Sequence, residues 1–119
     1  MGSSALADSA EALFARATAM APADGWLLVS RIRFELARRD GEHALASARM
    51  LATLYPEAAL GHSLSGAALL LLGRTDEARA ELLRARGARW EEDAGEQRAA
   101  LERVLNQIGP GATSLTPRP

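Results

Sequence analysis

The sequence contains no cysteine and no lysine, and only 4% of its 119 residues are aromatic. Without cysteine the chain has neither disulfide bonds nor thiolate metal sites. Hydrophobic residues still make up 48% of the chain, so its core must be built from leucine, alanine, valine and isoleucine. Alanine is abundant and has the highest helix propensity. The composition therefore favours an all-helical chain, and its length favours one domain.

The chain also has little net charge and no long apolar run. The formal net charge is −1 and the sequence pI about 6.1, so the basic patch of a nucleic-acid-binding protein is not expected. The longest uninterrupted apolar run, residues 67–72, is too short to span a bilayer, and we expect no membrane insertion. The first residues, MGSSALADSAEAL, lack the charged and apolar regions of a signal peptide. We therefore expect a cytoplasmic location, although MGSS is typical of an expression remnant on an excised fragment.

Small, apolar and proline residues recur with a regular period along the chain. Each copy begins with an alanine. An apolar residue follows four positions later, another follows after three more, and a proline or tryptophan ends the copy. These positions are Ala10, Ala44 and Ala78; Phe14, Ala48 and Leu82; Ala17, Leu51 and Ala85; and Pro22, Pro56 and Trp90. Three aligned copies indicate a repeat with a period of about 34 residues. The alternative is an ordinary helical bundle with an accidental period.

Turn-forming residues divide the chain into six predicted helices. The helices cover residues 4–20, 25–38, 42–54, 57–72, 76–86 and 91–108, and residues 109–119 form a flexible tail. Thr75 is a predicted N-cap, and Gly87 is a predicted C-terminal stop. The acidic run Glu91-Glu92-Asp93 is predicted to open the last helix, where the helix dipole favours negative charge.

This pattern resembles the tetratricopeptide repeat, whose signature places a small residue, Ala-x-x-x-Phe and a proline at this same spacing. Residues 59–90 are the best copy, with Gly66 at the family's position for close helix contact. Residues 25–58 form a weaker copy, with Ile32 in place of that glycine and Glu35 in place of an aromatic residue. A shift by one residue would put Phe34 or Leu36 there instead.

The resemblance implies an all-α fold in which antiparallel helical hairpins stack as a short right-handed solenoid. Residues 4–24 would be a half repeat and residues 91–108 a capping helix, so the repeat domain would cover residues 4–108. In such folds the first helices of successive repeats line a concave groove. The implied groove residues are Trp26, Val29, Ser30, Arg33, Leu36 and Ala37 from the first repeat and Leu60, Ser63, Leu64, Ala67, Leu70 and Leu71 from the second.

The implied function is protein–protein interaction, as an adaptor or scaffold that holds an apolar or amphipathic helical peptide in this groove. A narrower version is a small secretion-type chaperone for a partner helix. The alternative for the groove residues is that they belong to the core or are covered by the terminal helix. Another alternative for the function is a homo-oligomeric structural module, such as a homodimer, because the first helix lacks its usual predecessor. Its oligomer edge would contain Leu6, Leu13, Phe14 and Met20.

The sequence gives little support for a catalytic, metal-binding or phosphate-binding site. His43 and His62 fall on different predicted helices with no cysteine nearby, so no metal site is expected. None of the serines lies in a nucleophile elbow, and the stretch GRTDEA lacks the second glycine and the lysine of a phosphate-binding loop. We therefore predict no catalytic residues, no cofactor and no enzymatic activity.

Overall fold

The computed structural model describes residues 10, 13 and 25–109. Within this part of the chain the helices are α2 (Gly25–Ala37), α3 (Gly41–Leu54), α4 (Ala59–Leu71), α5 (Thr75–Arg86) and α6 (Gly95–Ile108), and no strand is present. The predicted all-α fold class is therefore confirmed. The predicted helix over residues 4–20, apart from Ala10 and Leu13, and the predicted tail after Gly109 lie outside the described residues.

The starts of four helices differ from the sequence predictions, and α3 begins at Gly41, one residue before the predicted start. α4 begins at Ala59 rather than at residue 57, because the chain before it pairs with Arg89: the Arg89 N–H donates to the Glu57 carbonyl and the Ala59 N–H donates to the Arg89 carbonyl, both at 2.9 Å. α6 begins at Gly95, so the acidic run 91–93 precedes the helix and forms a turn instead of opening it. The N-cap of α5 is residue 74, one position before the predicted Thr75.

The helices form two pairs, α2 with α3 and α4 with α5. The turn inside the first pair and the turn inside the second have the same hydrogen bonds, at positions one sequence period apart. The Arg39 N–H donates to the Leu36 carbonyl, and the Gly73 N–H donates to the Leu70 carbonyl. The next residues, Asp40 and Arg74, donate to the carbonyls of Glu35 and Leu69. Both turns need a left-handed residue, with φ of +60° at Arg39 and +74° at Gly73. The period of the sequence is therefore also a period of backbone geometry.

The buried positions follow the same period. α3 and α5 bury equivalent residues, namely Ala44 and Ala78, Ala48 and Leu82, and Leu51 and Ala85. α2 and α4 do so as well, since Ile32 and Gly66 are both buried and Glu35 and Leu69 are at most 1% exposed. The strict register of the repeat is therefore correct for α2, and neither Phe34 nor Leu36 replaces Glu35 at that position. The two helix pairs pack their cores with equivalent faces.

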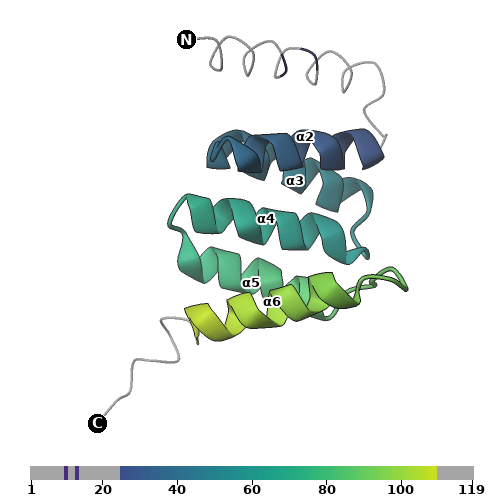
Figure 1. Ribbon diagram of the computed structural model, residues 1–119, viewed down its shortest axis with the longest axis vertical. Helices are drawn as coiled ribbons and strands as arrows, with labels where there is room; N and C mark the ends of the chain where they lie inside the picture. Colours follow the sequence, from purple (N-terminus) through teal and green to yellow (C-terminus); the bar gives the residue numbers. More distant parts are fainter. Residues whose placement is uncertain (1–9, 11–12, 14–24, 110–119) are drawn as a thin grey trace.

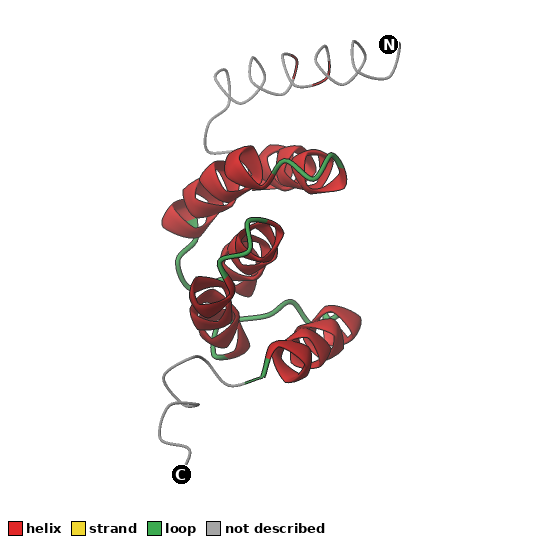
Figure 2. Ribbon diagram, turned by 90° about the vertical axis from the view of Figure 1, so that its left-hand side faces the viewer, coloured by secondary structure: helices red, strands yellow, loops and turns green. Residues whose placement is uncertain are grey.

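The helices follow one another along the long axis of the molecule, and each packs against the next (Figure 1). α2 also contacts α4 directly. Seen along the helices, α2 to α5 lie in two tiers, and α6 lies to one side of the lower tier (Figure 2). Close approach depends on small residues, because a Cβ atom on Gly66 of α4 would stand 2.6 Å from Cδ2 of Leu82 on α5. Gly66 thus has the role of close helix contact that was expected for it.

The chain between α5 and α6 is fixed by Trp90, which occupies the position that proline holds at residues 22 and 56. Its indole Nε1–H donates to the Ala85 carbonyl in the last turn of α5 at 2.9 Å. Its ring packs against a core cluster formed by Leu82, Ala85, Leu101 and Leu105, which joins α5 to α6. Trp90 therefore holds α6 and the connection before it against α5.

Candidate protein-binding surface

The exposed side of α2 carries four of its residues in one row. Trp26, Ser30, Arg33 and Ala37 follow the i, i+4, i+7, i+11 spacing that places residues on one helix face. All four are exposed, and Trp26 is 81% exposed. Such a high exposed fraction is unusual for a large apolar side chain among the described residues. α2 thus presents an indole, a hydroxyl, a guanidinium and a methyl group to solvent.

The outward side of α4 repeats this row one period later with Leu60, Leu64, Ala67 and Leu71, flanked by Ser63. All five are partly exposed. α4 contains no aspartate, glutamate, lysine or arginine, so its solvent-facing side carries no formal charge. Surface helices usually present charged and polar residues to water. The rows on α2 and α4 together are called the α2–α4 face below, and its uncharged half on α4 is its distinctive part.

A shared core connects α2 with α4. Leu28, Val29 and Ile32 of α2 form a buried cluster with Ala48 and Leu51 of α3. Three partly buried leucines, Leu36, Leu60 and Leu64, pack against this cluster. Through Leu60 and Leu64, α4 packs on α2 and α3. Of the predicted groove residues, the cluster brings together Val29, Leu36, Leu60 and Leu64.

Val29 is a correction to the predicted groove. It is only 5% exposed and belongs to the core cluster. It lies between Trp26 and Ile32, on the boundary between the exposed and the buried side of α2, and the packing of α4 against α2 covers it. Leu70 is partly exposed, like Leu60 and Leu64, and packs against two core clusters. Of the predicted groove residues, Val29 therefore offers little surface to a partner.

Of the predicted oligomer edge, the structure describes only Leu13, which is 63% exposed. Leu6, Phe14 and Met20 lie outside the described residues. Three further large apolar residues are exposed on or after α3, namely Met50, Leu54 and Tyr55. The tyrosine ring lies against Gly25, where a Cβ atom would stand 3.0 Å from Tyr55 Cε2. An aromatic residue therefore neighbours the start of α2.

Both histidines make polar contacts with carboxylates. His43 Nδ1 lies 2.7 Å from Asp40 Oδ2, and the His43 backbone N–H donates to Oδ1 of the same carboxylate, which caps α3. Partial burial alone would raise the pKa of Asp40. The hydrogen bonds from His43, with the nearby charges of His43 and Arg38, outweigh it, and the pKa lies below its ordinary value. Among the described residues, no three histidine, cysteine, aspartate or glutamate side chains gather as metal ligands would.

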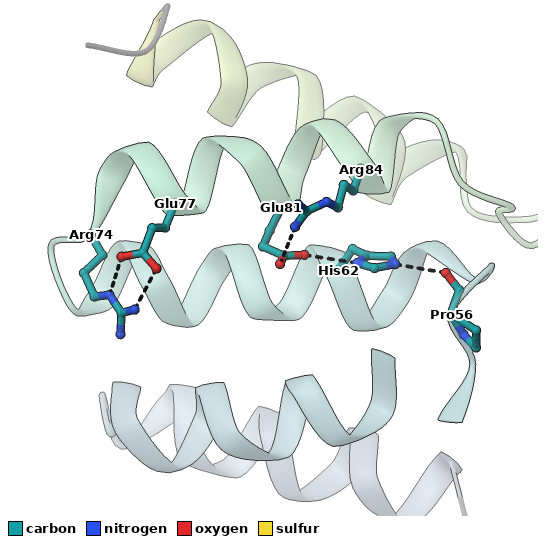
Figure 3. A network of polar contacts seen from close by, with 6 residues as sticks. All are labelled: Pro56, His62, Arg74, Glu77, Glu81 and Arg84. Atoms are coloured by element: carbon teal, nitrogen blue, oxygen red, sulfur yellow. Dashed lines mark hydrogen bonds and ion pairs between the residues drawn. The ribbon is translucent and has the colours of Figure 1, made fainter. Parts of the chain in front are cut away.

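His62 takes part in a network between α4 and α5 that sequence reasoning missed (Figure 3). Its Nδ1 lies 3.0 Å from Glu81 Oε1, and its Nε2 lies 3.0 Å from the Pro56 carbonyl oxygen. Arg84 donates to the other Glu81 oxygen at 2.9 Å. His62 and Glu81 are each 18% exposed. The network ties both helices to the turn before α4, so its role is structural.

A second, more exposed ion pair lies at the other end of the same helices (Figure 3). Arg74 donates from Nε and Nη2 to the two oxygens of Glu77 at 2.8 and 2.7 Å. This hydrogen bonding lowers the pKa of Glu77 and raises the pKa of Arg74.

A shallow depression beside the His62 network opens widely to solvent and is partly lined by Leu83, Gly87 and Arg89. It does not enclose a small ligand, and the α2–α4 face remains the candidate site.

No helix in the described part of the chain has both the length and the apolar character needed to cross a membrane. No protein-family model, no curated protein and no solved structure matches this chain.

Proposed function

We propose that the chain is a protein-interaction module without enzymatic activity, an adaptor or scaffold whose α2–α4 face holds an apolar or amphipathic helix of a partner. The observation that carries this proposal is the uncharged, partly exposed row of α4 together with the 81% exposed Trp26 on α2. Tryptophan is enriched among the residues that dominate binding energy at interfaces. Leucines at helical spacing are suited to the apolar stripe of another helix.

The repeat supports the same proposal. Equivalent turns and equivalent buried residues one period apart fit a tetratricopeptide-like hairpin repeat, which we propose as the finer description of the fold. In a right-handed solenoid of such hairpins, α2 and α4 would be the first helices of successive repeats. Their outward rows would then lie side by side on the concave surface.

Fluorescence anisotropy with a panel of labelled amphipathic helical peptides tests this function. Ala67→Glu places a charge in the middle of the α4 row and should reduce binding at least tenfold. Ala46→Glu is the matched control, because Ala46 is an exposed alanine in the middle of α3, outside the face. Circular dichroism should show both variants folded. Equal binding by the two variants, or no binding of any peptide to the original chain, would contradict the proposed function.

Self-association is a second candidate function that a separate observation favours. The large apolar residues that are exposed in the described part of the chain all precede residue 56: Leu13, Trp26, Met50, Leu54 and Tyr55. Exposed apolar surface concentrated in one half of a molecule is typical of an interface. Sedimentation velocity over a wide concentration range tests this alternative. Oligomers that dissociate in a Met50→Lys, Leu54→Lys double variant would support it, whereas a monomer at all concentrations would contradict it.

A further inference from the structure

The charge on the α2–α4 face is confined to one side. Of the eight residues in its two rows, only Arg33 is charged. Arg33 is exposed, and no acidic side chain in the described part of the chain forms an ion pair with it. The one acidic residue of α2, Glu35, is fully buried and accepts a hydrogen bond from Arg31 at 3.2 Å. The exposed charge of α2 is therefore entirely positive.

Arg33 lies at the border between the exposed row of α2 and the side that meets α4. It stands one helical turn after Val29 and one before Leu36, and residues at these i+4 and i+3 spacings are neighbours on a helix surface. Val29 belongs to the core cluster, and Leu36, Leu60 and Leu64 pack against that cluster. Arg33 therefore lies on the side of the exposed α2 row that is nearer to this packing, and a helix lying along the α4 row would meet it with one flank.

We propose that the partner helix carries carboxylate side chains on the flank that faces α2, next to an apolar stripe that faces α4. This inference rests on the proposed function and specifies its ligand. Arginine binds carboxylates through two parallel hydrogen bonds, and such a pair gains strength where a docked helix excludes water. The uncharged α4 row has no group that would pair with a charge on the other flank. The face thus selects an apolar helix with acidic residues on one side.

Two helix-stabilised peptides with the same length as α4 provide the test. They share the same leucine stripe and differ only in the flank, which carries glutamate in one and lysine in the other. Anisotropy titrations at low and at high salt give the two affinities. We expect the glutamate peptide to bind about fivefold more tightly at low salt, because a partly screened ion pair contributes about 1 kcal/mol. High salt should reduce this preference.

Two charge-reversal variants show whether Arg33 is responsible. Arg33→Glu should abolish or reverse the preference. Arg103→Glu changes the net charge equally at an exposed position on α6 and should leave the preference intact. If both peptides bind the original chain equally, or if both variants alter the preference to the same extent, the inference about acidic flanks is overturned while the proposed function stands. If neither peptide binds, the proposed function itself is overturned.

Discussion

Gly61 on α4 lies so close to Ala52 on α3 that a Cβ atom at position 61 would stand 2.6 Å from both the Cα and the backbone N atom of Ala52. The equivalent contact between α4 and α5 is different in kind. There a Cβ atom on Gly66 would meet the end of the Leu82 side chain at the same distance. A side chain can rotate away from an added methyl group, whereas a helix backbone must move as a whole.

Gly61→Ala should therefore destabilise the protein more than Gly66→Ala does. Separating α3 from α4 disturbs the core between them, and we expect a loss of about 1–3 kcal/mol in the free energy of unfolding. Gly66→Ala should lose less, because the Leu82 side chain can adjust. Urea unfolding followed by circular dichroism measures both. Gly95→Ala is the control, since a Cβ atom there meets no neighbour. Equal losses at positions 61 and 66 would contradict the assigned difference between the contacts.

Arg39→Gly should stabilise the protein. Arg39 adopts a left-handed conformation with φ of +60°, and its equivalent one period later is Gly73. A residue with a Cβ atom is less stable than glycine in this conformation by about 1 kcal/mol. Thermal unfolding should show a higher midpoint for Arg39→Gly and a lower one for Gly73→Ala. An unchanged or lower midpoint for Arg39→Gly would mean that the turn after α2 does not carry this strain.

Acid should weaken the cap of α3. The folded-state pKa of Asp40 is lowered from 3.8, so its carboxylate stabilises the fold above that pH, and the contribution is lost as the pH falls through the folded-state pKa. Asp40→Ala should reduce the free energy of unfolding by about 1 kcal/mol at neutral pH, and Asp40→Asn by less, because asparagine is also a good N-cap. The gap between the original chain and Asp40→Ala should narrow below pH 4. A gap that stays constant down to pH 2 would contradict this assignment.

The two ion-pair groups in Figure 3 should respond differently to mutation. His62→Ala removes the hydrogen bonds to the exposed Pro56 carbonyl and to the largely buried Glu81 carboxylate, which keeps its hydrogen bond from Arg84, and we expect a loss of about 1 kcal/mol. Glu77→Gln disrupts an exposed pair with Arg74, and its effect on stability should be the smaller. Parallel urea titrations measure both losses. A larger loss for Glu77→Gln would show that the His62 network is not an important tie between α4 and α5.

The sequence is sufficient to predict the features that repeat. The period of alanine, leucine and proline predicts which residues of α3 and α5 are buried, since the same faces must pack in each hairpin. It does not predict the fate of Val29, because a residue on the boundary of two helix faces is covered or exposed according to how α4 rests on α2. The register of the repeat puts Glu35 at a packing position, although a carboxylate by itself favours solvent. Arg31, one helical turn earlier, donates a hydrogen bond to the buried carboxylate.

Contacts between residues of different helices are even harder to predict from the sequence. His62 and Glu81 are far apart in the sequence and belong to different helices, so their pairing depends on how α4 and α5 are turned towards each other. The start of α6 is similar. The acidic run 91–93 fits a helix N-terminus by charge, but Trp90 fixes the chain to α5, and the helix begins only at Gly95.

The two tryptophans allow the α2–α4 face to be observed directly. In Trp90→Phe the remaining indole, Trp26, is 81% exposed, so its fluorescence should resemble that of indole in water and should be quenched readily by iodide. Binding of a leucine-striped peptide should shift this emission to the blue and protect it from iodide. In Trp26→Phe the remaining indole, Trp90, donates to the Ala85 carbonyl and packs between α5 and α6, so the same peptide should leave its emission unchanged. A peptide that binds but shifts only the emission of Trp90 would place the interface at α5 and α6 instead of at the α2–α4 face.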